Sequence, residues 1–264
     1  MKRLAIMYDW DQTLSPKYMS EFGLIKPLGF SCNEEYWNYC NNVITKKYNM
    51  ENELSFLYSI IEGAKKQNFN LNRDYMHEVG SRIEYYNGVE GWFDRINEFG
   101  KKHDVIVEHY IISSGIYEII EGSKIFPKFT KVFASSFAYD SDGRPFWPAF
   151  SVNYTNKTQY IFRIKKNLIH DLNDDGAVNR KYRKKDSIPY SNMIYIGDGL
   201  TDIPCMKIIK EYGGNSICLY EKGGASENKA KTIKREGRVN FVAEADYSEN
   251  SDIDKIVKHI IEKL

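Results

Sequence analysis

A chain of 264 residues can hold one large domain, or a core domain with a smaller companion. Its composition, 42% hydrophobic and 28% charged, is ordinary for a globular protein in water. Its 37 basic and 36 acidic residues leave a formal net charge of +1, so no global field attracts nucleic acid or a membrane surface. We therefore expect neither as a partner.

The first apolar run, Leu4–Tyr8, is too short for a signal peptide and leads directly into charged residues. No stretch approaches the roughly 20 apolar residues that are needed to span a bilayer. The four cysteines show no CxxC spacing, so neither a zinc site nor a disulfide framework is expected. Free thiols and a cytoplasmic location are predicted.

Short, continuous apolar runs that are bounded by polar or turn residues predict buried strands. In chain order these are Leu4–Tyr8, Tyr110–Ile112 with the valines before it, Val132–Ala138, Met193–Ile196, Ser216–Tyr220 and Val239–Val242. Helical spacing between them predicts helices at Trp92–Phe99, Ile116–Ile120, Gln159–Leu168 and Asp254–Ile261. Strands that alternate with helices pair in parallel through right-handed crossovers, so we expect a doubly wound, Rossmann-like α/β sheet.

One segment interrupts this alternation. From about Tyr18 to Tyr86 the sequence predicts several helices and no strand. Apolar residues recur there at helical spacing, in Glu34–Lys47, Glu51–Gln67 and Asn72–Tyr85. We therefore predict a smaller helical cap domain at residues 16–86, inserted into a core domain formed by residues 1–15 and 87–264. The alternative is that these helices only cover one face of the sheet.

Small, polar or acidic residues follow each of the three strongest apolar runs. After Leu4–Tyr8, Tyr110–Ile112 and Met193–Ile196 come, in turn, Asp9–Thr13, Ser113–Gly115 and Gly197–Asp202. Ligands of open α/β sheets bind at the carboxyl ends of the strands, so these segments are expected to meet there. Clustered carboxylates raise one another's pKa, and Mg²⁺ removes that penalty while it binds a substrate phosphate. Where the chain bends after the first strand, Asp11 is expected to leave the metal and face the substrate.

The motifs Asp9-Trp10-Asp11-Gln12-Thr13 and Gly197-Asp198-Gly199-Leu200-Thr201-Asp202, with Ser113 between them, resemble those of the haloacid dehalogenase-like (HAD) hydrolase superfamily. Their order and spacing are similar to those of phosphoserine phosphatase-like members, which carry a helical cap after the first motif. A DxDxT motif alone is a weak signal, but together with GDGxxD and a Ser-Ser-Gly strand end it is specific. The motifs extend over nearly the whole chain.

The resemblance implies a role for each matching residue. Asp9 is similar to the nucleophile that becomes an aspartyl phosphate, and Asp11 to the general acid/base. Ser113 resembles the residue that hydrogen-bonds the transferring phosphoryl group, and the neighbouring Ser114 amide resembles its helper.

The resemblance also implies a set of residues for a Mg²⁺ cofactor. Asp198 is similar to the superfamily's acidic metal ligand, and Asp202 to the second acid near the metal. The backbone carbonyl of Asp11 is similar to a further ligand. The predicted metal residues are therefore Asp9, Asp11, Asp198 and Asp202.

Members of the superfamily also have a lysine between the serine and the last acidic motif, which steadies the nucleophile and the phosphate. Lys157 is the best match, because it follows the extended stretch Phe146–Tyr154 and opens the next predicted helix. Lys165 and Lys166 are alternatives inside that helix, where a solvated face is the usual explanation.

Two segments with binding-site patterns are predicted to be surface loops. Residues 171–176 match the start of a Ca²⁺-binding EF-hand loop, but Tyr182 stands where the bidentate Glu is required. Residues 180–185 form a basic run with little aromatic interleaving, which does not favour nucleic-acid binding.

These residues predict a Mg²⁺-dependent phosphatase that hydrolyses a phosphate monoester of a small metabolite through an aspartyl-phosphate intermediate. The alternatives are a phosphomutase or phosphotransferase with the same apparatus, and a non-catalytic sensor of a phosphorylated ligand. A dehalogenase is disfavoured, because that chemistry requires neither Asp11 nor Mg²⁺. Trp10, Trp37 and Tyr39 are expected to contact the leaving group.

Overall fold

The computed structural model describes residues 1–170, 172, 175–179 and 187–264. The EF-hand-like loop at 171–176 lies partly outside these residues, and the basic run at 180–185 lies wholly outside them. No helix in the described ranges is long and apolar enough to cross a membrane.

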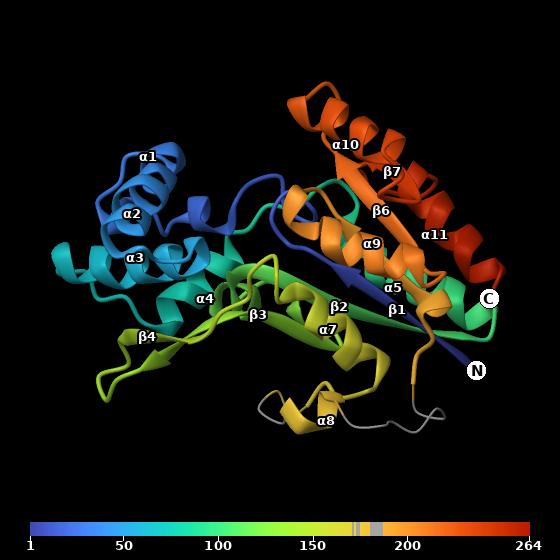
Figure 1. The fold of residues 1–264 in the computed structure, drawn as a ribbon, viewed down its shortest axis with the longest axis horizontal. Coiled ribbons are helices and arrows are strands. Elements are labelled where there is room, and N and C mark those ends of the chain that lie inside the picture. The colour runs from blue at the N-terminus through green and yellow to red at the C-terminus, as the bar shows by residue number, and fades with distance from the viewer. Residues whose placement is uncertain (171, 173–174, 180–186) are drawn as a thin grey trace.

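Within the described residues, seven strands form one sheet in the order β4-β3-β2-β1-β5-β6-β7 (Figure 1). Their bounds are β1 Lys2–Tyr8, β2 Val105–Ile116, β3 Lys131–Tyr139, β4 Pro145–Phe150, β5 Met193–Gly197, β6 Asn215–Tyr220 and β7 Phe241–Glu244. Neighbouring strands are parallel except for β3 and β4, which form an antiparallel pair at one edge. The chain builds outward from β1 in both directions, so the predicted doubly wound sheet is confirmed.

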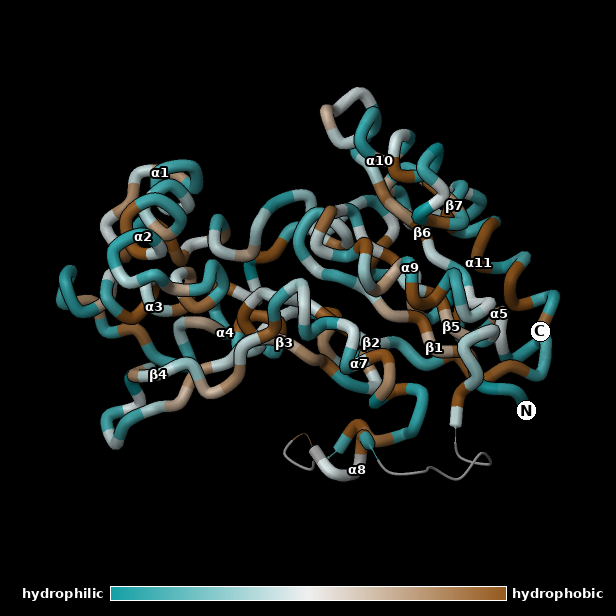
Figure 2. Tube along the Cα trace, in the orientation of Figure 1, coloured by the Kyte–Doolittle hydropathy of each residue, from teal (hydrophilic) through white to brown (hydrophobic). Residues whose placement is uncertain are grey.

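Alternation along the buried strands divides the core into two layers of side chains. On β1, Leu4 and Ile6 belong to one hydrophobic cluster, whereas Ala5 and Met7 belong to the other. The first cluster includes residues from α5 (Val89–Lys102), α6 (Tyr117–Glu121) and α11 (Asp252–Glu262). The second includes residues from α7 (Lys157–Lys165), α9 (Ile203–Glu211) and α10 (Ala225–Arg235). Figure 2 shows the central strands mainly in hydrophobic colours.

Two predicted boundaries differ from the structure for local reasons. β7 begins at Phe241 instead of Val239, because Asn240 makes hydrogen bonds to Ser216 through both its side chain and its backbone. α7 ends at Lys165 instead of Leu168, because Asn167 adopts a left-handed conformation with φ of 57°. Short helical turns lie at η4 Phe126–Lys128, α8 Asp175–Asn179, η6 Tyr190–Asn192 and η7 Leu200–Asp202.

The segment between β1 and α5 is a helical insert, as the sequence predicts. Its elements are η1 Met19–Phe22, η2 Lys26–Leu28, α1 Asn33–Asn38, the π-helical turn η3 Tyr39–Ile44, α2 Thr45–Tyr48, α3 Asn52–Lys66 and α4 Arg73–Ser81. In Figure 1, α1 to α3 stand at one end of the molecule and α10 and α11 at the other.

The insert is anchored to the rest of the chain through contacts between α4 and α6. A side chain at Gly80 would collide with the carbonyl of Ile119, and one at Gly122 would collide with the backbone of His77. Charged contacts reinforce this close approach, because Arg73 and His77 both contact Glu121, at 2.9 and 2.8 Å. The two helices therefore approach closely, and we expect their separation to be costly.

Candidate active site

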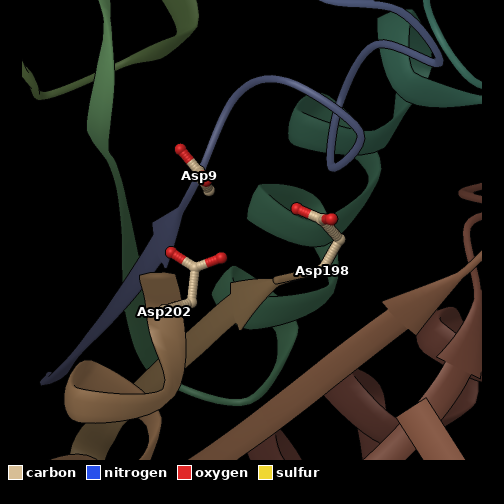
Figure 3. A group of neighbouring side chains, drawn as sticks. All are labelled: Asp9, Asp198 and Asp202. Atoms are coloured by element: carbon tan, nitrogen blue, oxygen red, sulfur yellow. The ribbon is translucent and has the colours of Figure 1, made fainter. Parts of the chain in front are cut away.

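Three carboxylates meet at the carboxyl ends of the two central strands β1 and β5 (Figure 3). Asp9 directly follows β1, and its amide donates to the carbonyl of Ile196 on β5 at 3.0 Å. Asp198 directly follows β5, and Asp202 ends the short helix η7. One carboxylate oxygen from each aspartate lies within 4.8 Å of the others. Parallel pairing of β1 with β5 thus brings together residues nearly 200 positions apart.

Lys157 contacts two of these carboxylates. Its Nζ lies 3.0 Å from Oδ2 of Asp9 and 2.8 Å from Oδ1 of Asp202, and the lysine is 1% exposed. Lys165 lies elsewhere, 4.3 Å from the centre of the Tyr190 ring. Lys166 donates to the carbonyl of Val178. Of the three predicted lysines, Lys157 is therefore the one beside Asp9.

Asp202 is held by several donors. Its Oδ1 accepts from the hydroxyl of Tyr195 at 2.8 Å as well as from Lys157, and its Oδ2 accepts from the amide of Gly199 at 3.3 Å. A side chain at Gly197 would collide with the Asp202 carboxylate, so the strand end can approach it only as glycine. Asp202 is thus fixed in position and fully buried.

Asp11 lies in the turn that follows Asp9. Gln12 adopts a left-handed conformation with φ of 57°, and three amides after it bond to the carbonyl of Trp10. Oδ1 of Asp11 accepts from the amide of Met19 at 2.8 Å, which fixes the carboxylate at the start of the insert. Asp11 lines the cavity above the cluster, as expected for a group that faces a substrate.

Ser113 and Ser114 reach the same cavity from the end of β2. The Ser113 hydroxyl accepts from the amide of Gly115 at 3.1 Å. Met19 of the insert packs against this end of β2. Its sulfur accepts from the amide of Ile116, and a side chain at Gly115 would collide with Met19. The strand end is thus shaped to present small polar groups to the cavity.

Crowding of acidic groups perturbs their protonation. Burial and the charge of Asp202 raise the pKa of Asp9 to about 6, although Lys157 acts in the opposite direction. Burial, Asp202 and Asp9 raise the pKa of Asp198 to about 7. Burial and the charge of Asp9 raise the pKa of Asp11 well above its ordinary value. Burial disfavours the Lys157 ammonium, but the charges of Asp202 and Asp9 outweigh this effect and raise its pKa.

The cluster of Asp9, Asp198 and Asp202 could bind a metal ion. Three carboxylates with one buried lysine leave an excess of negative charge. Burial first, and then the charges of neighbouring aspartates, raise the pKa values of Asp9 and Asp198. A divalent cation would remove the repulsion among these charges. Oxygen-only donors suit a hard cation such as Mg²⁺ and offer no sulfur or imidazole to a softer metal.

A cavity of about 340 Å³ opens above the carboxylates. Five of the predicted site residues line it, namely Asp9, Asp11, Ser113, Ser114 and Asp198. The insert contributes the opposite wall, which includes Tyr18, Met19, Trp37, Asn52, Glu53 and Phe56. The volume suits a small molecule.

Two of the three aromatic residues that were expected to contact the leaving group do not line this cavity. Trp10 is fully buried and packs against Tyr85 and Phe129, because its side chain points away from Asp9 into the core. Tyr39 lies outside the lining and donates to Glu62 at 2.6 Å. The expectation was therefore wrong for Trp10 and Tyr39, whereas Trp37 does line the cavity.

Sequence reasoning missed two charged residues of the lining. Glu53 stands in the first turn of α3, and Lys229 stands on α10 near Asp198. Neither belongs to a motif, and each looks like an ordinary charged residue on a helix surface. Only the folded arrangement identifies them.

The chain resembles proteins of known structure over nearly its whole length. A HAD family hydrolase from Salmonella enterica serovar Typhi shares 18% identity with a TM-score of 0.64, covering 98% of this chain and 72% of that one. A phosphoserine phosphatase, in a form that is an analogue of its phospho-aspartyl intermediate, shares 17% identity with a TM-score of 0.58, covering 98% and 99%.

Sequence comparison adds one relative of similar length. An uncharacterised protein of Borreliella burgdorferi is 28% identical over 288 residues, which covers 99% of this chain and 96% of that protein. No protein-family model matches the chain. The structural likeness, with its seven-stranded sheet and helical insert after β1, identifies the fold. The chain has the fold of the haloacid dehalogenase-like hydrolases, with phosphoserine phosphatases among its structural neighbours.

Proposed function

We propose that this protein is a Mg²⁺-dependent phosphatase that hydrolyses a phosphate monoester of a small metabolite. The observation that carries the proposal is the contact of Lys157 with Asp9, inside a carboxylate cluster that opens into a small cavity. Asp9, Asp198 and the backbone carbonyl of Asp11 would hold the metal. Bound Mg²⁺ would offset the charge of the phosphate and orient it for in-line attack.

In the first step, a carboxylate oxygen of Asp9 attacks phosphorus and the bond from phosphorus to the leaving oxygen breaks. Asp11 gives its proton to that oxygen, so the product leaves as an alcohol. The raised pKa of Asp11 supports this assignment, because it keeps the carboxyl protonated to a higher pH than usual. Ser113 and the amide of Ser114 bind the transferring phosphoryl oxygens.

In the second step, water attacks phosphorus and gives a proton to the Asp11 carboxylate. The acyl-phosphate bond breaks, which releases inorganic phosphate and restores the Asp9 carboxylate. Lys157 neutralises Asp9 throughout, and Asp202 positions Lys157, since both oxygens of Asp202 already accept hydrogen bonds. Asp202 would therefore act mainly through the lysine.

We also propose that residues 16–86 act as a cap domain over the core formed by 1–15 and 87–264. One wall of the cavity comes from this segment, which supports a role in excluding water and selecting the leaving group. Core residues would then supply the chemistry and insert residues the specificity.

The test is release of inorganic phosphate from a panel of phosphorylated metabolites and p-nitrophenyl phosphate, with Mg²⁺ present. Wild-type protein should release phosphate, and Asp9→Asn should not, although it still folds. Absence of release from every ester would overturn the proposal. Transfer of the phosphoryl group to a second alcohol, without free phosphate, would instead identify a phosphotransferase.

A further inference from the structure

The wall that the insert presents to the cavity has its own chemistry. It combines three aromatic rings, Tyr18, Trp37 and Phe56, with the carboxyl group of Glu53. The Trp37 and Phe56 rings are stacked, with centroids 5.1 Å apart and an interplanar angle of 13°. Tyr18 packs against Trp37 at 5.8 Å, tilted by 58°. These contacts hold the rings in place before any ligand binds.

Glu53 lacks a cationic partner within the described part of the chain. Its Oε2 is buried and accepts no hydrogen bond from the described residues. Glu51, the residue that precedes α3, is also acidic and caps the helix by accepting from the Leu54 amide. Glu53 is partly buried and its nearest carboxyl neighbour is Glu51, so no positive charge among the described residues pairs with it. A cation in the cavity would supply that charge.

The other charges of the lining belong to the opposite side of the cavity. Asp9, Asp11 and Asp198 surround the proposed phosphate and metal positions. Lys229 is the one basic residue among the described lining residues, and its charge acts on Asp198. Among the described residues, the insert wall thus presents an acidic group and no basic one. It suits a leaving group with a positive charge and disfavours one with a carboxylate or a second phosphate.

Aromatic faces beside a carboxylate are the combination that binds organic cations. We propose that this wall binds an ammonium group, so that the substrate is an alkyl phosphate whose alcohol ends in a positively charged ammonium. Trimethylammonium fits best, because it contacts ring faces without requiring hydrogen-bond acceptors. This inference rests on the proposed phosphatase function and names its substrate class.

The experiment compares phosphocholine with 3,3-dimethylbutyl phosphate, which has the same shape and no positive charge. Wild-type kcat/KM should favour phosphocholine by about tenfold or more. Glu53→Gln, which keeps the size and loses the charge, should lower the ratio severalfold through KM, while the aromatic rings retain the rest of the preference. Glu62→Gln, on the same helix and outside the lining, is the matched control and should keep the preference. Equal rates on both esters, or an unchanged ratio in Glu53→Gln, would overturn the inference.

Two further measurements distinguish a failure of the ammonium proposal from a failure of the phosphatase proposal. Hydrolysis of p-nitrophenyl phosphate by wild type, which does not depend on an ammonium group, tests the chemistry alone; its absence would count against the phosphatase proposal itself. Calorimetric binding of the two esters to Asp9→Asn tests the ammonium preference without turnover, and again phosphocholine should bind about tenfold more tightly. Phosphoethanolamine should rank below phosphocholine. The reverse order would overturn the part assigned to the aromatic rings.

Discussion

Nζ of Lys157 lies 3.0 Å from Oδ2 of Asp9, and both residues are buried. The lysine begins α7 and the aspartate directly follows β1, so two separate elements of the core are joined at this contact. A buried cation beside a buried carboxylate stabilises the ionised form, which is the form that a nucleophile requires.

Replacing Lys157 by Met removes the charge and nearly preserves the side-chain volume. We expect turnover to fall by about 10²-fold or more, since preorganised charge is among the largest contributions to catalysis. The free energy of unfolding should fall by about 3 kcal/mol, because Asp9 and Asp202 remain buried without their cation. Steady-state kinetics and denaturant unfolding measure the two effects. Lys165→Met, on the same helix, is the control and should leave turnover within about twofold of wild type.

Removal of metal tests the carboxylate cluster. Excess chelator should abolish turnover, Mg²⁺ should restore it, and Ca²⁺ should support it poorly because its longer, more numerous bonds loosen in-line geometry. Mg²⁺ should also raise the melting temperature, since it binds the folded state only. In Asp198→Asn that rise should be much smaller. Full activity in chelator would contradict the proposed cofactor.

Gly197 and Gly199 give a matched pair of substitutions around Asp202. A Cβ at Gly197 would collide with the Asp202 carboxylate, whereas a Cβ at Gly199 would meet only ordinary contacts, the nearest being Oγ1 of Thr201 at 3.6 Å. Gly197→Ala should therefore displace Asp202, loosen Lys157 and lower kcat about tenfold or more, with a lower melting temperature. Gly199→Ala should keep the melting temperature of wild type. Equal melting temperatures in the two variants would contradict this account of Asp202.

The sequence predicts the sheet because buried parallel strands are continuous apolar runs, and Leu4–Tyr8 and Met193–Ile196 are of this kind. Helices α9 and α10 were not predicted. In α10 the buried residues are Ala230 and Ile233, too few to produce a readable period. The prediction that Trp10 contacts the leaving group was wrong for a different reason. Its position next to Asp9 in the sequence does not indicate on which side of the turn its side chain lies.

The candidate site also has a part that the sequence predicts and a part that it does not. The sequence predicts that Asp9, Ser113 and Asp198 lie close together, because each follows a predicted strand and the carboxyl ends of parallel strands lie at one edge of the sheet. The insert wall depends on how α1 to α3 pack over the cavity, which no local pattern encodes, so Glu53 could not be found from the sequence. The division into core and cap domains stays a prediction.

The ammonium proposal leads to a pH dependence. Burial and the neighbouring Glu51 carboxyl raise the pKa of Glu53 to about 8, while the Lys157 charge lowers it. Below pH 8, Glu53 is therefore mostly protonated in the free protein and must lose a proton to pair with a cation. KM for phosphocholine, relative to that for 3,3-dimethylbutyl phosphate, should fall as pH rises from 6 to 8, by up to about tenfold per unit. Glu53→Gln should flatten the ratio, and a ratio that rises with pH in wild type would contradict the assignment.

Asp11 distinguishes a phosphatase from a protein that merely binds phosphate. Its carboxylate accepts from the Met19 amide at 2.8 Å and faces the cavity. With p-nitrophenyl phosphate the leaving group barely needs a proton, so Asp11→Asn should slow the first step little. Hydrolysis of the aspartyl phosphate still needs a base, and its loss should slow the second step by about 10²–10⁴-fold.

Rapid mixing of Asp11→Asn with p-nitrophenyl phosphate should then give a burst of p-nitrophenol, about one equivalent per site, followed by a slow steady phase. Asp9→Asn should give neither burst nor turnover, because no carboxylate remains to accept the phosphoryl group. On an alkyl ester the departing oxygen requires a proton, so Asp11→Asn should slow the first step too. No burst of the alcohol should then appear. Wild-type turnover of both esters by Asp11→Asn would exclude this residue as the acid/base, and the two-step mechanism would then need a different proton donor.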